Sequence, residues 1–244
     1  MPKITEILFD CDNTLVLSED LAFEACADIS NEILAKNNIN HRYTGEQLIV
    51  DFVGQNFRGM MVSLQAKFNF TMAPEELEAY VKEEENRVIA KLVEKAQPCV
   101  GATEELEKLE KSGKYGLAVV SSSALRRVRA SIQKVNQERF FDKDHVFSAA
   151  TSLEKPTTKP DPAIYLHAMK VLKKEPTECV AIEDSKSGAL SAIRAGIPVI
   201  AYVGSYHGAA KQTEMAGVLT DLGCKVVMKN WSEFEKCLAE IEAL

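Results

Sequence analysis

Paired carboxylates follow a short apolar run near the start of the chain, in the segment ILFDCDNT at 7–14. The run predicts a short buried strand, and Asp10 and Asp12 alternate around Cys11, so in an extended chain they point to the same side. Asn13 suits a tight turn because it tolerates left-handed backbone. Two carboxylates this close repel unless a proton or cation lies between them. The pair therefore suits Mg²⁺ binding or acid/base catalysis, with an Asp-rich turn as the plainer alternative.

Further polar residues stand where later strands are expected to end. Ser121 follows the apolar run at 116–120, Glu183 and Asp184 follow the run at 179–182, and Lys159 precedes a helix that opens with Pro162. In a doubly wound parallel sheet, the carboxyl ends of the strands meet at one crevice. Carboxylates, a hydroxyl and an ammonium together suit a phosphoryl group, whose transfer requires charge neutralisation and in-line positioning.

Each of these later residues also has a plainer interpretation. Ser121 could cap the following helix, and Glu183 could be an ordinary acid at a helix start, where negative charge is favoured. Lys155 is a nearby rival to Lys159, but only Lys159 precedes the Pro-Asp-Pro sequence.

The second half of the chain alternates helical and strand patterns. We expect helices at 102–112, 124–135, 161–172, 187–195 and 231–243, and strands at 116–120, 145–149, 179–182, 199–202 and 225–228. This alternation predicts an α/β fold, a doubly wound parallel sheet with right-handed crossovers. The segment 142–158 is long and polar, and we assign it no function.

The stretch between the first strand and Pro98 shows only helical patterns, at 18–37, 45–52, 57–68 and 74–95. It is either a helical layer of the same domain or a cap inserted after the first strand. We favour the cap, because strand-and-helix units resume only after Pro98. We therefore expect an α/β core at 1–16 and 97–244 and an α-helical cap domain at 17–96.

Charge and cysteine usage narrow the class of protein. The 244-residue chain carries a net charge of −7, which argues against nucleic acid or an anionic membrane as the main partner. Its six scattered cysteines form no C-x-x-C pair and predict reduced thiols in an intracellular protein. We see no signal peptide and no apolar run long enough to span a bilayer. We expect a cytoplasmic, monomeric enzyme with a small phosphorylated substrate.

Four motifs in this order resemble those of the haloacid dehalogenase (HAD) superfamily. They are Asp10-x-Asp12-x-Thr14, the strand-end Ser121, Lys159-Pro160-Asp161-Pro162, and Glu183-Asp184-Ser185-x-x-Gly188. The combination looks most like the β-phosphoglucomutase-like branch, whose phosphatases and phosphomutases carry a small helical C1 cap. The resemblance covers nearly the whole chain and implies a HAD Rossmann-like core.

The resemblance implies roles for the carboxylates. Asp10 is the nucleophile and forms an aspartyl-phosphate, which divides one hard step into two easier ones. Asp12 protonates the leaving oxygen and then acts as the base for water, which requires a proton that neighbouring carboxylates would favour. Mg²⁺ is held by the side chains of Asp10 and Asp184 and by the backbone carbonyl of Asp12. Glu183 is a water-mediated metal partner.

The same resemblance assigns the phosphate contacts. Ser121 and backbone N–H groups such as that of Ser122 hold phosphate oxygens, and Thr14 belongs to the same binding set. Lys159 joins Asp10 to the phosphate and offsets its negative charge.

Residues 54–58 of the cap resemble the substrate-specificity loop of this branch, with Gln55, Asn56 and Arg58 as substrate-binding candidates. Arg58 is the best candidate to meet an anionic or hydroxylated end of the substrate. A solvated arginine at a helix start is the alternative. Sugar, polyol and sugar-acid phosphates all fit.

The sequence supports other functions less well. Ala22 stands where mutases of this branch carry an acid/base His, which favours hydrolysis over phosphomutase activity. A dehalogenase would not need Asp12 or the metal pair Glu183 and Asp184, and a non-catalytic binding module would not need every catalytic position filled. Zinc, Ser–His, Cys-nucleophile and P-loop chemistries lack their motifs. We expect a Mg²⁺-dependent phosphatase.

Overall fold

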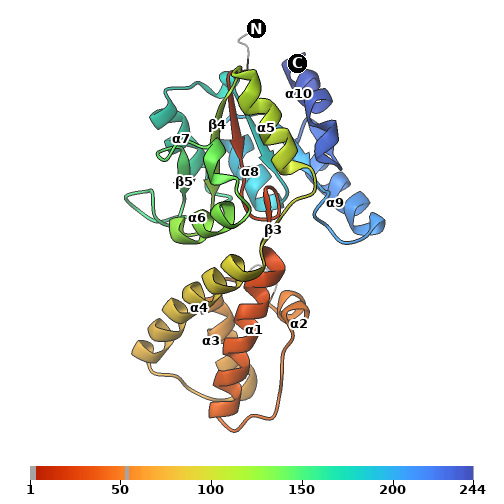
Figure 1. Cartoon of the computed structure of the whole chain (residues 1–244). Helices are drawn as coiled ribbons and strands as arrows, with labels where there is room; N and C mark the ends of the chain where they lie inside the picture. Colours follow the sequence, from red (N-terminus) through yellow and green to blue (C-terminus); the bar gives the residue numbers. More distant parts are fainter. Residues whose placement is uncertain (1–3, 53–54, 244) are drawn as a thin grey trace. The chain divides into compact units, whose positions relative to one another are not determined.

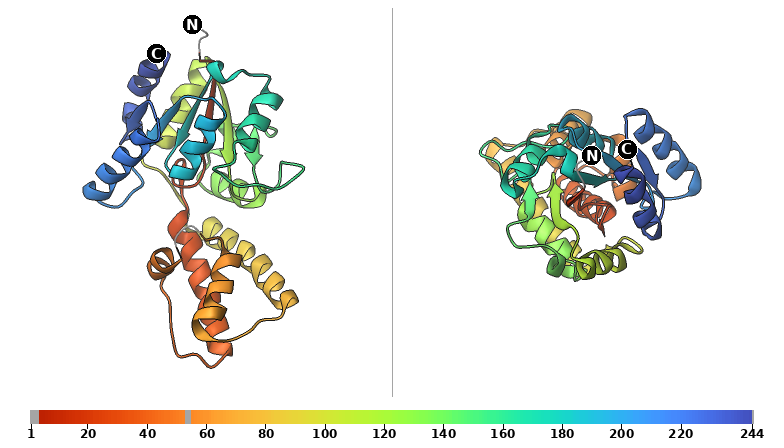
Figure 2. Two further views of the ribbon diagram at one scale, coloured as in Figure 1. Left: turned by 180° about the vertical axis from the view of Figure 1, so that it is seen from behind. Right: turned by 90° about the horizontal axis from the view of Figure 1, so that it is seen from above.

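The chain divides into two units in the computed structural model, which describes residues 4–52 and 55–243 (Figure 1). The larger unit, here called the core unit, contains the chain up to Leu17 and again from Gln97 onward. The smaller, here called the helical unit, contains Ser18–Ala96. Helices cover both faces of the sheet in the core unit, as Figure 2 shows from two further directions.

The core unit contains all the described strands. They are β1 (Glu6–Phe9), β2 (Val16–Leu17), β3 (Gln97–Pro98), β4 (Gly116–Ser121), β5 (Val146–Ser148), β6 (Cys179–Glu183), β7 (Val199–Tyr202) and β8 (Val226–Met228). Its α-helices are α5 (Ala102–Ser112), α6 (Leu125–Lys134), α7 (Ala163–Leu172), α8 (Lys186–Arg194), α9 (Ala209–Asp221) and α10 (Phe234–Glu242). Short 3-10 turns cover Glu138–Phe140, Pro176–Glu178 and Trp231–Glu233.

Six parallel strands form the main sheet in the order β5-β4-β1-β6-β7-β8. The central strand pairs on both sides in register, with Leu8 opposite Ala118 of β4 and opposite Ala181 of β6. The chain winds outward through β4 and β5 on one side and through β6, β7 and β8 on the other. The direction of winding therefore changes at β1, which is where doubly wound sheets bind ligands. The predicted fold class is confirmed.

Apolar side chains pack on both faces of this sheet. On one face Leu8 and Ala118 join a cluster with residues of α7, α8 and α9, including Ile164 and Leu219. On the other face the ring of Phe9 lies 6.0 Å from that of Phe141, 6.1 Å from Trp231 and 6.5 Å from Phe234. The alternation of side chains along a strand thus buries β1 completely. Its two ends differ, with Glu6 at the start and Asp10 just beyond the finish.

The helical unit consists of α1 (Glu19–Lys36), α2 (Gly45–Asp51), α3 (Phe57–Phe68) and α4 (Pro74–Lys95). Start signals explain three of these boundaries. Thr44 forms a capping box at α2, Asn56 accepts a hydrogen bond from the first turn of α3, and Pro74 opens α4. The core of the unit is made of aliphatic and aromatic residues such as Ile33, Leu48, Met61 and Phe57. The four predicted helices of this stretch are confirmed.

Some elements differ from the sequence-based expectations. Strands β2 and β3 form an antiparallel pair that we did not predict, because each is only two residues long and their pairing is non-local. Helix α9 was also missed. It begins without a side-chain cap and contains Gly217. Helix α7 begins at Ala163 rather than Asp161, because the Asp161 side chain accepts the hydrogen bond of the Ala163 N–H (2.9 Å).

Two properties of the described part of the chain bear on its class. None of its helices is both long enough and apolar enough to cross a bilayer. The six cysteines, which all lie within the described residues, are buried and form no disulfide, in agreement with the prediction of reduced thiols.

Candidate active site

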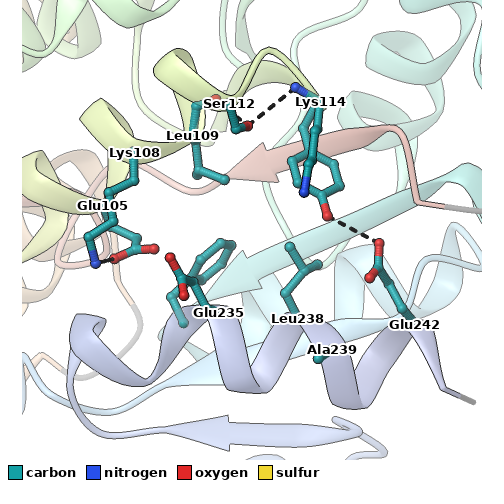
Figure 3. A pocket seen from close by; sticks show the side chains of 11 residues that line it. Glu105, Lys108, Leu109, Ser112, Lys114, Glu235, Leu238, Ala239 and Glu242 are labelled. Atoms are coloured by element: carbon teal, nitrogen blue, oxygen red, sulfur yellow. Dashed lines mark hydrogen bonds and ion pairs between the residues drawn. The ribbon is translucent and has the colours of Figure 1, made fainter.

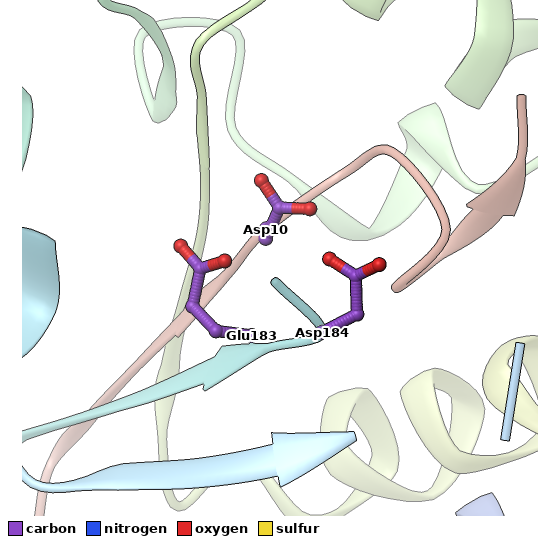
Figure 4. A group of neighbouring side chains, drawn as sticks. All are labelled: Asp10, Glu183 and Asp184. Carbon is purple, nitrogen blue, oxygen red and sulfur yellow. The ribbon is translucent and has the colours of Figure 1, made fainter. Parts of the chain in front are cut away.

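Three carboxylates converge at the carboxyl ends of the two central strands β1 and β6. Asp10 follows β1, Glu183 ends β6 and Asp184 comes next, and Figure 4 shows their side chains gathered at this edge of the sheet. One carboxylate oxygen from each lies within 4.8 Å of those of the others, and all three residues are buried. Because Phe9 of β1 lies opposite Ile182 of β6, the next residues along the two segments, Asp10 and Glu183, are neighbours.

Lys159 supplies the positive charge next to this cluster. Its buried ammonium donates to Asp10 Oδ1 (2.7 Å), to Glu183 Oε1 (2.6 Å) and to the carbonyl of Val120 (2.7 Å). Each of its three N–H groups thus has an acceptor. Burial opposes the charge, but Asp10 and Glu183 outweigh it and raise the pKa of Lys159 above its usual value. The rival Lys155 is exposed.

The acidic cluster is electrostatically suited to a cation. Burial raises the pKa of Asp10, although Lys159 opposes the shift. Burial likewise raises the pKa of Glu183 to about 7, again with Lys159 opposing. Glu183 Oε2 has no hydrogen-bond partner among the described residues. Hard carboxylate oxygens in this number are the ligands that Mg²⁺ prefers, so the residues present fit a Mg²⁺ ion.

Asp12 lies beside the cluster and is surrounded by hydrogen-bond donors. Its Oδ2 accepts from Ser123 Oγ (2.6 Å) and Ser121 Oγ (3.4 Å), and its Oδ1 lies 3.4 Å from Arg127 Nη2. We expected neighbouring carboxylates to favour a proton on Asp12. These donors act in the opposite sense, because they stabilise an ionised carboxylate.

Ser121 occupies the end of β4 and is fully buried. Its hydroxyl accepts from the Ser123 N–H (3.0 Å) and donates to Asp12. Helix α6 starts later, with Ala124 at its N-cap and no side-chain cap. The alternative in which Ser121 caps the following helix is therefore excluded.

Ser122 and Thr14, two predicted phosphate contacts, differ in their hydrogen bonding. Ser122 Oγ accepts from the backbone N–H of Lys159 (3.1 Å), so its side chain anchors the segment that carries the lysine. Thr14 is fully buried, and its hydroxyl has no hydrogen-bond partner among the described residues.

Sequence reasoning missed three residues of this site. Tyr165 donates to Glu183 Oε1 (2.5 Å), while Ser123 and Arg127 both contact Asp12. Signals for them exist in the sequence. Ser123 extends the run of serines after β4, Arg127 follows four residues later, and Tyr165 shares a buried helical face with Ala168 of α7.

The polar segment 142–158, to which we assigned no function, contains β5 and supports the run of serines at 121–123, here called the serine loop. Ser148 Oγ donates to the carbonyl of Ser123 (2.7 Å), and Thr151 Oγ1 donates to Ser148 Oγ (2.8 Å). Thr151 Oγ1 also accepts from the N–H of Leu125 at the start of α6 (3.2 Å). This segment therefore helps to fix the loop that contacts Asp12.

The substrate-binding candidates of the helical unit have partners within that unit. Gln55 Oε1 accepts from Ser63 Oγ (2.9 Å), and Asn56 caps α3. Arg58 forms an ion pair with Glu78, with Nη2 donating to Oε2 at 2.7 Å. Arg58 is exposed in the first turn of α3, as the solvated alternative has it, and pairs there with Glu78. Position 54 of the predicted loop lies outside the described residues.

A separate concave pocket of about 300 Å³ opens between α5 and α10 of the core unit (Figure 3). It is lined by apolar residues such as Leu109, Phe234 and Leu238, with Glu105, Glu235 and Glu242 among them. None of the catalytic candidates lines it. This pocket is therefore separate from the carboxylate cluster.

The fold and the cluster together define a class of hydrolase. Residues 7–202 match the family described as haloacid dehalogenase-like hydrolase. Because the match spans most of the chain, the chain belongs to this family, which confirms the resemblance of its motifs.

Named relatives fall within the same class. The chain is 29% identical to 6-phosphogluconate phosphatase of Escherichia coli K12 over 85% of this chain and 86% of that protein. It is 31% identical to the phosphorylated carbohydrates phosphatase of Thermotoga maritima over 78% of this chain and 81% of that protein. A HAD family hydrolase of Deinococcus radiodurans, solved with phosphate and sodium, aligns over 100% of this chain and 99% of that chain with 26% identity and a TM-score of 0.73. The chain thus groups with enzymes that hydrolyse phosphoric monoesters.

Proposed function

We propose that this protein is a Mg²⁺-dependent phosphatase that hydrolyses a small phosphorylated metabolite through an aspartyl-phosphate on Asp10. The observation that carries the proposal is the buried carboxylate of Asp10, with Lys159 on one oxygen and Glu183 and Asp184 beside it. The relatives that act on 6-phosphogluconate and on phosphorylated carbohydrates support a sugar, polyol or sugar-acid phosphate as substrate.

Magnesium fits the donor set of this site. The side chains of Asp10 and Asp184 and the backbone carbonyl of Asp12 would hold it, with Glu183 as an outer partner. When bound, the ion neutralises phosphate charge and orients the phosphoryl group.

The chain's own groups then divide the reaction into two steps. A carboxylate oxygen of Asp10 attacks phosphorus while the bond to the leaving oxygen breaks, and Asp12 gives that oxygen its proton. In the second step water attacks the phosphorus of the aspartyl-phosphate, Asp12 takes the proton, and Asp10 is released. A bound phosphoryl group adds negative charge near Asp12 and so favours the proton that the first step requires.

Lys159 and the serine loop hold the phosphoryl group during both steps. Lys159 offsets charge that develops on the transferred group. Ser121, the N–H of Ser122 and Thr14 supply further donors. The Thr14 hydroxyl, which has no hydrogen-bond partner within 4–52 and 55–243, supports this role.

The helical unit acts in this proposal as a cap domain at 17–96, inserted into a core domain at 1–16 and 97–244. Caps exclude water and recognise the part of the substrate that does not react. We assign substrate recognition to Gln55, Asn56 and Arg58, and we expect a cytoplasmic monomer.

A phosphomutase of the β-phosphoglucomutase type is the alternative. It would return the phosphoryl group to a sugar hydroxyl and would need a second acid/base group. Position 22 on α1, where that group is expected, carries a buried alanine that cannot exchange protons. Hydrolysis needs no acid/base group other than Asp12, so we prefer hydrolysis to the mutase reaction.

The test is a panel of phosphate esters incubated with the enzyme and Mg²⁺. It includes 6-phosphogluconate, hexitol phosphates and β-glucose-1-phosphate with a bisphosphate primer. We expect inorganic phosphate to be released from at least one small ester. Conversion of β-glucose-1-phosphate to glucose-6-phosphate, with no ester releasing phosphate, would replace the phosphatase by the mutase.

A further inference from the structure

Tyr165 is a buried phenol in contact with the charged centre of the core unit. Its hydroxyl donates to Glu183 Oε1 at 2.5 Å, and the same oxygen accepts from Lys159 Nζ at 2.6 Å. The face of the Tyr165 ring lies against the lysine, with Nζ 5.2 Å from the ring centroid. A phenol this close to a carboxylate oxygen is the donor of the hydrogen bond, since the carboxylate can only accept.

The shared oxygen couples Tyr165 to the nucleophile through Lys159. Two carboxylates, Asp10 and Glu183, compete for one ammonium at nearly equal distances of 2.7 and 2.6 Å. A hydrogen bond from a phenol withdraws negative charge from the oxygen that accepts it. Donation by Tyr165 therefore weakens the attraction of Glu183 for Lys159 and leaves more of the ammonium's field on Asp10.

We propose that Tyr165 is a positioning residue, whose hydroxyl shares Glu183 Oε1 with Lys159 and thereby keeps the ammonium within hydrogen-bond distance of Asp10. The inference rests on the proposed phosphatase activity. The proposed function gives Tyr165 no contact with the substrate, so we expect its effect on the chemical step. Lys159 and Asp10 must be correctly spaced when charge develops on the phosphoryl group.

Tyr165→Phe tests the hydroxyl alone, because it keeps the ring and its contact with Lys159. We expect kcat to fall about tenfold, the scale of one hydrogen bond to a charged group, while KM stays within about twofold. Tyr115→Phe is the matched control. Its hydroxyl bonds to Glu242 on the exposed surface, at 3.2 Å, and its loss should leave both constants unchanged. Thermal unfolding verifies that each variant is folded.

A double-mutant cycle separates positioning from packing. In the Glu183→Gln background the carboxylate charge is gone, so adding Tyr165→Phe should change the remaining kcat by less than about twofold. An equal tenfold loss in both backgrounds would overturn the proposal, and so would an unchanged kcat in the single variant. If Tyr165→Phe does not fold alone, a tenfold loss of kcat on adding it to Glu183→Gln still overturns the proposal.

The outcomes also distinguish this inference from the proposed function. A wild-type enzyme that releases no phosphate from any ester contradicts the phosphatase assignment. An active wild type with an equally active Tyr165→Phe variant contradicts only the role of Tyr165 and leaves the phosphatase assignment intact.

Discussion

Burial of carboxylates has different consequences at the two ends of β1. Beyond the carboxyl end, Asp10 has Lys159 at 2.7 Å and belongs to the acidic cluster. At the start of the strand, Glu6 is 3% exposed, its Oε1 has no hydrogen-bond partner among the described residues, and Lys174 is 3.9 Å from Oε2. Glu6 therefore reduces stability when it is charged, whereas the charge of Asp10 is offset by Lys159.

Glu6 makes the stability of the fold depend on pH. Burial, opposed in part by Lys174, raises the pKa of Glu6 from 4.5 to about 7. The folded state thus holds this proton more tightly than the unfolded chain. The associated stabilisation is complete below about pH 4.5 and is lost as the pH rises through about 7.

Glu6→Gln removes this ionisation and keeps the shape of the side chain. We expect it to raise the free energy of unfolding by about 1–3 kcal/mol at pH 8 and by little at pH 5. Urea denaturation at the two pH values measures the difference. Glu110→Gln on the exposed side of α5 is the control and should show no such pH dependence. An equal effect of Glu6→Gln at both pH values would refute the assignment.

At the scale of elements, the first turn of α8 makes room for Glu183. A Cβ atom added at Gly188 would lie 1.8 Å from Glu183 Oε2 and 2.3 Å from its carboxyl carbon. Glu183 cannot easily move away, because Lys159 and Tyr165 both hold its other oxygen. The glycine of the Glu-Asp-Ser-x-x-Gly motif is thus required by the carboxylate at the start of the same motif.

Gly188→Ala should displace Glu183 and disturb Lys159. We expect a loss of about 1–3 kcal/mol in the free energy of unfolding, the usual cost of overpacking, and a fall in kcat of about 10–100-fold. Gly217→Ala in α9 is the matched control, since its added methyl meets nothing within 4 Å. It should stabilise the protein by about 0.5–1 kcal/mol with unchanged activity. Wild-type kcat in Gly188→Ala would contradict the steric argument.

Local patterns predicted most elements, because strand and helix signals were strong where the chain packs on the apolar core of each unit. Asn13 adopts the left-handed backbone expected of it, with φ of 56°. Long-range partners could not be predicted in this way. The Glu183 contact of Tyr165 spans 18 residues and the Glu78 contact of Arg58 spans 20. Both depend on packing that spacing along the chain does not encode.

At the scale of the whole molecule, two segments far apart in sequence complete one site. Asp10 follows β1 and Asp184 follows β6. These strands are neighbours in the sheet, because the direction in which the chain winds changes at β1. A ligand that needs both carboxylates can bind only the folded chain. Binding of such a ligand therefore stabilises the fold.

We accordingly expect Mg²⁺ to raise the stability of the protein. At concentrations well above its dissociation constant, it should add about 1–3 kcal/mol to the free energy of unfolding and raise Tm. A chelator should reverse the shift and abolish phosphate release. Asp184→Asn should lose most of the Mg²⁺-induced shift in Tm. Asp221→Asn, at an exposed position at the end of α9, should keep it. Full activity in excess chelator would contradict the metal assignment.

The central claim, that Asp10 is the nucleophile of a phosphatase, is tested most directly by Asp10→Asn. Asn keeps the size of Asp10 but cannot form the aspartyl-phosphate, because it has no carboxylate oxygen to attack phosphorus. With Mg²⁺ and the best ester of the panel, we expect phosphate release to fall by about four to six orders of magnitude, with the fold intact by thermal unfolding. Asp221→Asn should release phosphate at the wild-type rate. Appreciable turnover by purified, folded Asp10→Asn would contradict the covalent mechanism.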